Sequence, residues 1–350
     1  MKSSPGLCQF RNYGTTNADV FRYTPETGID PVRSLEVKTV VKYRLEQLIA
    51  TKVLSDDIKV FVKPEPHKTS KLEEGRYRLI SAVSLIDTLV DRVLFGWLQR
   101  KALLTVGKTP CFCGWSPIRG GWRYLRDRFL NYKVYCLDKS SWDWTVQEYL
   151  IKLWYNFIIH LAMDHRPWWR QAVKSRFTAL FRDAVFQFSD GTRVAQGAPG
   201  IMKSGCFLTL LLNSVGQSFV HYLVMLRLGE SPLLYQPITM GDDTVQKFFE
   251  FMEAYLKELT KLGVKVKYTK ERRWVEFCGF TITNDSCTPS YWEKHLFNLC
   301  HGELAEKLAS YQIMYANEPR MAHFLHTIAS RFIPELGLSS VEAKQIMNAC

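Results

Sequence analysis

Two adjacent aspartates, Asp242 and Asp243, stand in the sequence Met-Gly-Asp-Asp-Thr between two short apolar runs that favour β-structure. This pattern predicts a hairpin with both carboxylates at its tip. Adjacent carboxylates at a turn supply the oxygen ligands that Mg²⁺ prefers, and the ion then keeps positions for water and substrate phosphates. A lone Gly-Asp turn is more commonly a solvated hairpin. The metal-binding interpretation therefore depends on which other groups the chain supplies.

Asp138 is the first candidate partner for this turn. It directly follows residues 132–137, an apolar run typical of a buried strand, where a carboxylate is unfavourable unless it is paired or binds a cation. Asp143 has two compatible interpretations, as the N-cap of an apolar helix predicted over residues 146–161 and as a functional carboxylate.

Residues 61–80 form a basic segment that leads into a predicted strand. Strand alternation places Arg76 and Arg78 on one face, and two guanidinium groups so arranged match the oxygens of a triphosphate. A solvated edge strand with scattered charge explains the same residues about as well.

The glycine-rich residues 196–205 precede a predicted helix that carries Thr209 and Asn213 on one face. A glycine-rich loop at a helix N-terminus is typical of phosphate binding. It is not the P-loop of NTPases, because Met202 stands where that motif has the glycine before Lys-Ser. Buried threonine and asparagine in an apolar helix usually have a specific hydrogen-bond partner.

The segments around these groups are predicted to be mainly helical, and so is most of the chain after residue 280. A basic insertion with Lys174, Arg176 and Arg182 precedes the glycine-rich loop. Apolar periodicity predicts helices over residues 32–54, 84–100, 146–161 and 249–262, and composition predicts hairpins near residues 189–192 and 274–280.

Composition narrows the class of protein. The chain has 350 residues, 47% of them hydrophobic, which is enough for one large enzyme or for two or three domains. The net charge of +12 favours a polyanionic partner such as nucleic acid, with a membrane surface as second choice. Nine cysteines without a CxxC pair favour a reducing compartment and free thiols. A zinc site is the weaker alternative, because no common ligand spacing matches Cys287, His295, Cys300 and His301.

Neither a secretory signal nor a membrane span is predicted. The N-terminal sequence lacks an apolar run followed by a cleavage site. The most apolar long stretch, residues 206–226, is predicted to be a buried helix, since it carries the polar residues Asn213, Ser214, Gln217, Ser218 and His221.

Taken in order, these features resemble the palm and fingers of an RNA-dependent RNA polymerase from a positive-strand RNA virus, and they are most similar to the sobemovirus and polerovirus group. The combination is far more specific than any one motif. The match extends over residues 3–280 and is carried by residues 61–80, 137–144, 197–213, 241–243 and 275–278.

The resemblance implies an α+β fold of the right-hand polymerase type, with a palm of antiparallel sheet backed by helices. By the same resemblance, the N-terminal part of the fingers is expected to be short or missing and the thumb to be small. The implied boundaries are fingers 1–130, palm 131–164 and 194–282, a fingers insertion 165–193, and thumb 283–350.

The implied reaction is template-directed transfer of ribonucleotides from NTPs to an RNA 3′-hydroxyl. Asp138 and Asp242, with Asp243 beside them, would hold two Mg²⁺ ions, with Mn²⁺ as a substitute. One ion lowers the pKa of the 3′-hydroxyl, and the other binds the phosphates and the leaving pyrophosphate. Lys270 falls nearest to the family's proton donor to pyrophosphate, and Lys267 is the second candidate.

Further site residues follow from the same resemblance. Asp143 and Asn213 match the pair that reads the ribose 2′-hydroxyl, with Ser204 and Thr209 in support. The basic motif over the triphosphate corresponds to Lys63, Arg76 and Arg78. The residues matched to the template or primer are Ser3, Gly6, Gly205, Phe277 and Cys278, the last two in a hairpin that supports the primer end.

The implied partners are an RNA template with its primer or product, NTPs, a viral genome-linked protein and other replication proteins, at virus-induced replication complexes in the host cytoplasm. The sequence is compatible with both de novo and protein-primed initiation, and with a natural protein that is longer than this chain.

A reverse transcriptase shares the palm chemistry, but its aspartate pair usually follows an aromatic residue, whereas Met240 and Gly241 precede it here. A capsid-like RNA-binding protein explains the charge but not the acids.

Overall fold

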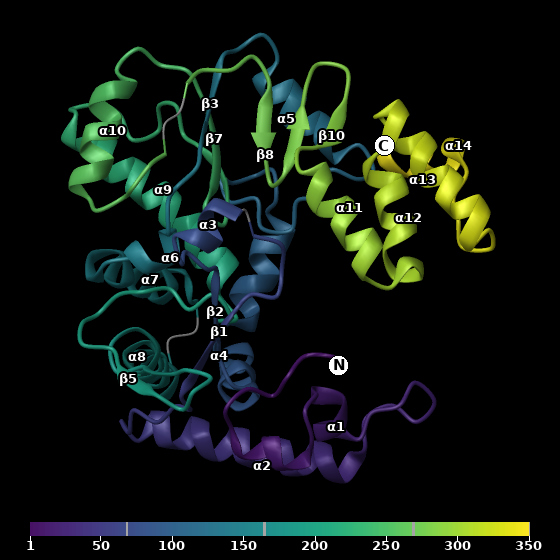
Figure 1. Ribbon diagram of the computed structural model, residues 1–350. Coiled ribbons are helices and arrows are strands. Elements are labelled where there is room, and N and C mark those ends of the chain that lie inside the picture. The colour runs from purple at the N-terminus through teal and green to yellow at the C-terminus, as the bar shows by residue number, and fades with distance from the viewer. Residues whose placement is uncertain (68, 164–165, 268–269, 350) are drawn as a thin grey trace. The chain divides into compact units, whose positions relative to one another are not determined.

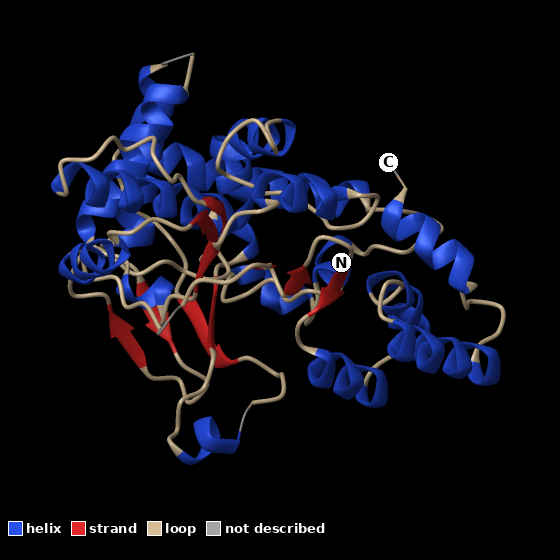
Figure 2. Cartoon of the chain, turned by 90° about the horizontal axis from the view of Figure 1, so that it is seen from above, coloured by secondary structure: helices blue, strands red, loops and turns tan. Residues whose placement is uncertain are grey.

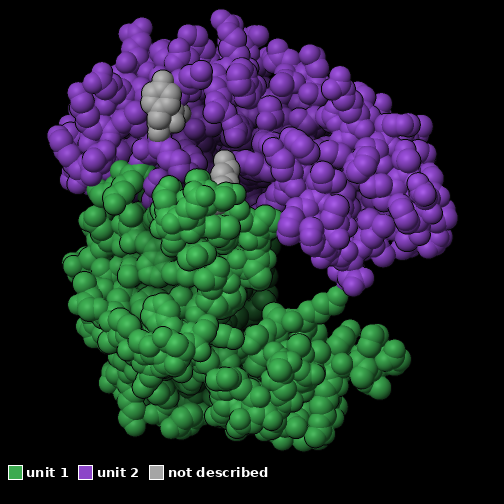
Figure 3. Space-filling model, viewed as in Figure 1, with its two compact units in different colours: residues 1–105, 141–219, 263–265 green, residues 106–140, 220–262, 266–350 purple. Residues whose placement is uncertain are grey.

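The computed structural model describes residues 1–67, 69–163, 166–267 and 270–349. The chain divides into two compact units (Figure 3). Unit 1 comprises residues 1–105, 141–219 and 263–265, and unit 2 comprises residues 106–140, 220–262 and 266–350. Each unit is therefore assembled from separate stretches of sequence, and in both units short strands lie among longer helices (Figure 2).

Unit 1 contains one four-stranded sheet in the order β2-β1-β4-β5 (Figure 1). Strand β1 pairs antiparallel with β2 and parallel with β4, and β4 and β5 form an antiparallel hairpin. Helix α9 (Thr209–Arg227) begins in unit 1 and ends in unit 2. The other elements of unit 1 are η1 (Gln9–Tyr13), α1 (Asn17–Phe21), α2 (Pro31–Ile49), β1 (Ile58–Val62), α3 (Thr69–Glu73), β2 (Leu79–Ala82), α4 (Leu85–Leu104), α6 (Trp142–Thr145), α7 (Glu148–Leu161), α8 (Pro167–Phe181), β4 (Val185–Gln187) and β5 (Arg193–Ala195).

Side-chain caps fix where the long helices of unit 1 begin. Asp30 accepts a hydrogen bond from the backbone N–H of Arg33 at the start of α2, where Pro31 occupies the first turn. Ser84 caps α4 in the same way, by accepting from the backbone N–H of Asp87. These two N-caps thus define the first turns of α2 and α4.

Unit 2 contains two three-stranded sheets, in the orders β3-β7-β6 and β10-β9-β8, in which all pairs are antiparallel (Figure 1). Its remaining elements are helices on the sheets and a helical C-terminal region. The bounds are α5 (Gly121–Phe129), β3 (Val134–Leu137), β6 (Ile238–Met240), β7 (Asp243–Lys247), α10 (Met252–Lys261), β8 (Val275–Phe277), β9 (Phe280–Ile282), β10 (Cys287–Pro289), α11 (Trp292–His301), α12 (Leu304–Met314), α13 (Pro319–Phe332) and α14 (Ser340–Asn348).

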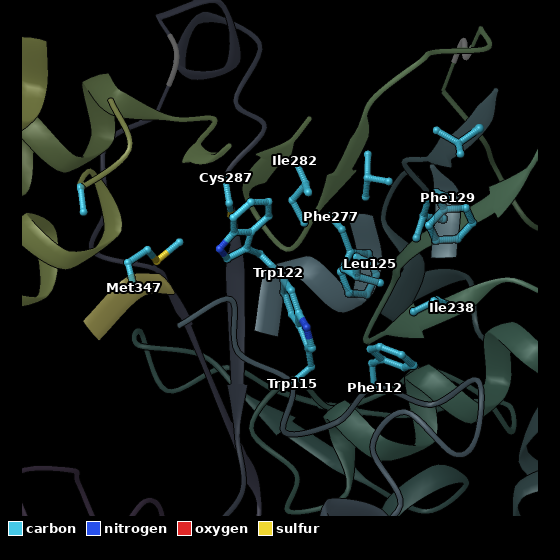
Figure 4. Close-up of a cluster of buried hydrophobic side chains, with 14 of the residues drawn as sticks. Phe112, Trp115, Trp122, Leu125, Phe129, Ile238, Phe277, Ile282, Cys287 and Met347 are labelled. Atoms are coloured by element: carbon cyan, nitrogen blue, oxygen red, sulfur yellow. The ribbon is translucent and has the colours of Figure 1, made fainter. Parts of the chain in front are cut away.

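A cluster of buried apolar side chains joins the two sheets of unit 2 (Figure 4). Trp122 and Leu125 of α5 pack in this cluster with Phe277 of β8. Ile238 of β6 and Val245 of β7 are 1% and 0% exposed on the two strands that flank the aspartate turn. Because close-packed interiors resist displacement, the turn rests on a rigid base.

The predicted hairpins are confirmed as β4-β5, β6-β7 and β8-β9, and the chain beyond β10 is helical as predicted. The mixed α and β content with antiparallel sheets agrees with the expected fold class. The predicted helices are present with shifted boundaries. Within the described residues, α9 is the one helix long and apolar enough to span a membrane, and 61% of its most apolar window is buried.

The strand predicted through Arg76 and Arg78 is wrong. Strand β2 begins only at Leu79, and both arginines precede it in irregular structure after α3. Gly75 adopts a left-handed φ of +63° directly after this short helix, as glycine often does where helices end. The alternation of a strand therefore does not apply to these two side chains.

Two further predictions are wrong. Asp143 lies within α6, while α7 begins after Gln147, so Asp143 is not the N-cap of the long helix. Arg176, predicted as part of a basic insertion, is 1% exposed and forms a bidentate pair with Asp91, from Nε to Oδ1 at 2.6 Å and from Nη2 to Oδ2 at 3.0 Å. The Arg176 charge is therefore neutralised by Asp91 inside unit 1 and is not on the surface.

Candidate active site

The aspartate turn lies at the end of the β6-β7 hairpin in unit 2. Met240 and Asp243 are opposite each other in the antiparallel register, so Gly241 and Asp242 form a two-residue turn. Gly241 has a φ of +67°, in the left-handed region that a side chain disfavours. The glycine thus makes the turn, and it directs Asp242 and Asp243 to the end of the sheet.

Asp138 follows β3, which pairs antiparallel with β7. Leu137 is opposite Thr244 at the last pair of this ladder. Asp138 and Asp243 are the next residues on the two strands, so the sheet brings together acids that are far apart in sequence. Asp138 and the aspartate turn therefore lie at adjoining strand ends, and the sharing of metal ions by their carboxylates stays a prediction.

The carboxylate of Asp243 is affected by the neighbouring acids. Burial of its carboxylate, followed by the negative charges of Asp242 and Asp138, raises the pKa of Asp243 to about 6, against the favourable charge of Lys139. The residue as a whole retains solvent exposure. The backbone N–H of Cys278 hydrogen-bonds this carboxylate and favours its ionised form, so the β8-β9 turn contacts the acidic group.

Lys267, and not Lys270, contacts Asp138. The Lys267 ammonium pairs with Asp138 Oδ2, and its backbone N–H donates to the Asp138 carbonyl at 3.0 Å. The neighbouring residues Lys139 and Val266 form an antiparallel bridge, which aligns the two segments. Lys270 is exposed, and its charge acts on Glu271.

Lys139 and Thr244 belong to the site but were missed in the sequence. Lys139 is 6% exposed, and its ammonium donates to Thr244 Oγ1 at 2.9 Å. Burial lowers the pKa of Lys139 to about 8, while the charges of Asp242, Asp243 and Asp138 oppose this shift. The available signal was position, because each residue directly follows one of the acids.

The chemistry of these donors fits a hard divalent cation, since three carboxylates converge at one end of a sheet. Within the described residues, however, no group of three or more His, Cys, Asp and Glu side chains lies close enough to hold a metal ion. Asp138 is turned to the Lys267 ammonium, whose place a metal ion would have to take. The residues that would hold the metal are Asp138, Asp242 and Asp243.

In unit 1, Asp143 and Asn213, the two residues matched to the ribose-reading pair, form a hydrogen bond with each other. Asn213 Nδ2 donates to Asp143 Oδ1 at 2.8 Å, and Trp142 Nε1 donates to Asn213 Oδ1 at 2.9 Å. Asn213 is 5% exposed, so both ends of its amide are fixed. Only one carboxylate oxygen of Asp143 takes part in the bond to Asn213, which orients this carboxylate.

Ser204, Gly205 and Thr209 connect the glycine-rich loop to its surroundings. Ser204 and Ser81 exchange hydrogen bonds, from Ser204 N to Ser81 Oγ at 2.8 Å and from Ser81 N to Ser204 Oγ at 3.0 Å. A Cβ on Gly205 would lie 2.8 Å from the Ser81 carbonyl oxygen, so the backbones approach closely here. Thr209 Oγ1 donates to the Lys203 carbonyl at 2.7 Å and closes the loop against α9.

A buried lysine, Lys203, holds the same loop and was not singled out in the sequence. Its ammonium contacts Gln196 Oε1 and donates to the Ile201 carbonyl at 3.0 Å. Burial lowers the pKa of Lys203 to about 7. Ile201 has a φ of +51°, which is rare and strained for a β-branched residue. The loop is therefore held in a conformation that it would not adopt unaided.

The residues predicted to hold the triphosphate are paired with acids. Glu65 contacts Lys63 at 3.1 Å and Arg78 at 2.6 Å, while Arg76 pairs with Glu74. All three basic side chains retain solvent exposure, at 36%, 60% and 63% in the order Lys63, Arg78 and Arg76. The Arg76–Glu74 pair is exposed on both sides and is therefore weak, whereas the Glu65 side chain, which holds Lys63 and Arg78, is only 10% exposed.

The residues matched to template and primer occupy two places. Near the N-terminus, Gly6 has a φ of +71° and its N–H donates to Ser4 Oγ, while Ser3 Oγ accepts from Asn17 Nδ2 at 3.0 Å. In the β8-β9 hairpin, Phe277 is 1% exposed and packs edge-to-face on Trp115. Cys278 forms the turn with a φ of +50°. Contact of these residues with RNA stays a prediction.

Comparisons with known proteins identify the family of this chain. The family model for viral RNA-dependent RNA polymerase matches residues 41–300. Over 258 residues the chain is 33% identical to the replicase polyprotein P2AB of Southern cowpea mosaic virus, which covers 70% of this chain and 26% of that protein. Over 262 residues it is 34% identical to the replicase polyprotein P2AB of Southern bean mosaic virus, which covers 70% and 25%.

Over 266 residues the chain is also 31% identical to protein P1-P2 of potato leafroll virus, and this match covers 71% of this chain and 24% of that protein. The chain thus spans about a quarter of the length of these relatives. The resemblance to the sobemovirus and polerovirus group is confirmed. Since the family model covers most of the sequence, this chain belongs to the family of viral RNA-dependent RNA polymerases.

Proposed function

We propose that this chain transfers ribonucleotides from NTPs to the 3′-hydroxyl of an RNA strand under the direction of an RNA template. The observation that carries the proposal is the placement of Asp138 and the Asp242–Asp243 turn at adjoining ends of β3 and β7. Family membership supports the same reaction. A fold of fingers, palm and thumb with the boundaries given above is part of the proposal.

Asp138, Asp242 and Asp243 would hold two Mg²⁺ ions, or Mn²⁺ in their place. Such ions lower the pKa of the attacking hydroxyl and neutralise charge on the leaving pyrophosphate. The chain's own part is to present three carboxylates from a rigid sheet, with Asp242 as the principal ligand at the turn. Burial first, and then the charges of Asp242 and Asp138, raise the pKa of Asp243, and a bound cation would favour the ionised carboxylate against both effects.

Lys267 is the proposed proton donor to pyrophosphate, since its ammonium already lies at Asp138. A donor must reach the group that it protonates, and this criterion ranks Lys267 above Lys270. Asp143 and Asn213 are proposed to read the ribose 2′-hydroxyl, supported by the carboxylate that Asn213 orients. Lys63, Arg76 and Arg78 are proposed to exchange their acidic partners for the triphosphate.

The proposed partners are the RNA template, its primer or product, and NTPs. The matched relatives are much longer than this chain, and two are named replicase polyproteins. This supports association with other replication proteins. A genome-linked protein as a partner, and a location at replication complexes in the host cytoplasm, are further parts of the proposal. The net charge of +12 favours retention of RNA at physiological salt.

Primer extension with purified protein tests the reaction. Asp242→Asn keeps the size of the side chain but removes a ligand charge, so incorporation should fall by about a hundredfold or more, while RNA binding is retained. Asp285→Asn is the matched control, because Asp285 is an exposed aspartate elsewhere in unit 2. Equal incorporation by the Asp242→Asn and Asp285→Asn proteins would refute the catalytic assignment.

Sugar selection is tested by competition between NTPs and dNTPs. Asn213→Ala removes the amide that orients Asp143, so the preference for ribonucleotides should decrease by about tenfold, the scale of one or two hydrogen bonds. Asn156→Ala, at an exposed position of α7, serves as the control. A wild-type preference for dNTPs would instead favour a reverse transcriptase.

A further inference from the structure

Two buried residues, Lys139 and Thr244, link the strands that carry the catalytic acids. Each directly follows an acid in the chain, Lys139 after Asp138 and Thr244 after Asp243. They are 6% and 4% exposed, and the bond from Lys139 Nζ to Thr244 Oγ1 measures 2.9 Å. Since Leu137 and Thr244 face each other at the end of the β3-β7 ladder, this bond extends the strand pairing by a side-chain contact.

A buried ammonium is unfavourable unless opposite charge compensates it. Here the compensation is shared, because Asp242, Asp243 and Asp138 all attract the Lys139 charge. The same three carboxylates repel one another, and the Lys139 charge opposes the effect of Asp242 and Asp138 on the pKa of Asp243. The ammonium therefore relieves the repulsion that would otherwise drive Asp138 and the aspartate turn apart.

The two lysines near Asp138 differ in what they contact. The Lys267 side chain is 55% exposed and lies directly on Asp138 Oδ2, a ligand atom. The Lys139 ammonium is buried, and its hydrogen bond goes to a hydroxyl. Lys267 has to leave Asp138 before a metal ion can bind there, whereas Lys139 can stay in place while the carboxylates bind a metal.

We propose that Lys139 is a positioning residue, an internal cation which donates to Thr244 and keeps Asp138 and the Asp242–Asp243 turn together, so that their carboxylates can close on a divalent cation. This inference rests on the proposed function, because it assumes that these acids bind the metal. Charge repulsion alone predicts that loss of a positive charge from the site tightens cation binding. The positioning role of Lys139 predicts the opposite, namely that loss of Lys139 weakens cation binding.

Metal binding without catalysis is the primary measurement. Free Mn²⁺ is titrated against the protein and followed by electron paramagnetic resonance. Lys139→Met keeps the aliphatic length and removes the charge, and its Kd for Mn²⁺ should rise by about tenfold, the usual effect of losing a residue that orients metal ligands. Thr244→Val should raise the Kd by less, since the ammonium remains.

The double variant tests whether the two residues act through one bond. Lys139→Met with Thr244→Val should bind Mn²⁺ as weakly as Lys139→Met alone, because both substitutions remove the same contact. Lys257→Met, at a 71% exposed lysine of α10, is the control and should leave the Kd unchanged. In primer extension, a high Mn²⁺ concentration should restore most of the rate of the Lys139→Met protein.

A Kd for Lys139→Met that equals or falls below the wild-type value would overturn the proposal. Circular dichroism and the melting temperature show whether each variant is folded. If Lys139→Met does not fold, Thr244→Val decides, and an unchanged Kd would then overturn the proposal. Should Asp242→Asn leave Mn²⁺ binding unchanged, the proposed metal site itself fails. Binding that depends on Asp242 but not on Lys139 refutes only the positioning role.

Discussion

Lys267 holds Asp138 at two points, through its backbone N–H at 3.0 Å from the Asp138 carbonyl and through its ammonium on Asp138 Oδ2. The backbone bond belongs to the pairing of the two segments and keeps Lys267 in place. The ammonium contact is exposed on both sides, with side-chain exposures of 55% and 63%, and is therefore exchangeable. A cation thus already occupies one of the predicted metal ligands.

Lys267→Met should tighten Mn²⁺ binding and slow incorporation. The substitution frees Asp138 Oδ2, and an exposed pair of this kind corresponds to a change in Kd of about two- to fivefold. Incorporation falls because the proposed proton donor is lost. Lys270→Met is the control, with a Kd within about twofold of wild type. The assignment of Lys267 fails if Lys270→Met is the variant with the slower chemistry.

Gly205→Ala should destabilise the protein and disturb the glycine-rich loop. The new Cβ would lie 2.8 Å from the Ser81 carbonyl oxygen and 3.0 Å from the Ala82 Cα, both backbone atoms that cannot move aside alone. Overpacking of this type costs about 1–3 kcal/mol, measured as the shift in free energy of unfolding in urea. The exchange of hydrogen bonds between Ser81 and Ser204 should weaken as well, so incorporation also falls.

Gly197→Ala in the same loop is the matched control. Its added Cβ meets nothing within 4 Å, and Gly197 is not in the left-handed region. Its stability should stay within about 0.5 kcal/mol of wild type. Equal effects of the two substitutions would mean that the close approach to Ser81 does not limit the loop.

Asp91→Asn should destabilise unit 1 strongly. Arg176 and Asp91 are each 1% exposed and form two hydrogen bonds, so the neutral amide leaves a buried guanidinium without its main counter-charge. The expected loss is about 3–5 kcal/mol in the free energy of urea unfolding. Asp183→Asn, which breaks the exposed pair with Arg182, should cost less than about 1 kcal/mol. Similar losses for both would contradict the buried network.

The sequence was most informative where structure is local. A glycine before two aspartates between apolar runs predicts a hairpin because the turn and its strands lie within a few residues, and the observed pairing of Met240 with Asp243 confirms it. The pair of Asp143 with Asn213 was implied by the family pattern alone. Local pattern contained no information on their contact, since α6 and α9 are distant in sequence.

The errors have a common physical cause. Arg76 and Arg78 alternate with apolar residues as in a strand, but strand formation depends on a partner, and the β1 register ends with Val62 opposite Leu79. The sequence did not show that Arg176 is buried and paired, because its partner Asp91 lies on another helix. Lys139 was overlooked for the same reason, as its hydroxyl partner is on β7. Residues that come into contact only through the tertiary fold produce no periodic pattern in the sequence from which the contact could be predicted.

His221 should make the stability of unit 2 depend on pH in the acid range. It is fully buried, with Nε2 2.9 Å from the Leu234 carbonyl and Nδ1 3.0 Å from Tyr255 Oη, an arrangement that the neutral ring satisfies at both nitrogens. Burial lowers the pKa of His221 to about 4 from 6.5 in the unfolded chain. The unfolded state therefore binds the extra proton between these values and the folded state does not.

The stabilising contribution of neutral His221 is thus complete above pH 6.5 and is lost as the pH falls towards 4. Between pH 7.5 and pH 4.5 the wild type should lose about 2–3 kcal/mol more free energy of urea unfolding than His221→Gln, which keeps a donor and an acceptor but cannot be protonated. His326→Gln, at an exposed histidine of α13, should follow the wild type. Parallel pH profiles for the wild type and His221→Gln would show that folding does not change the pKa of His221, and would contradict this prediction.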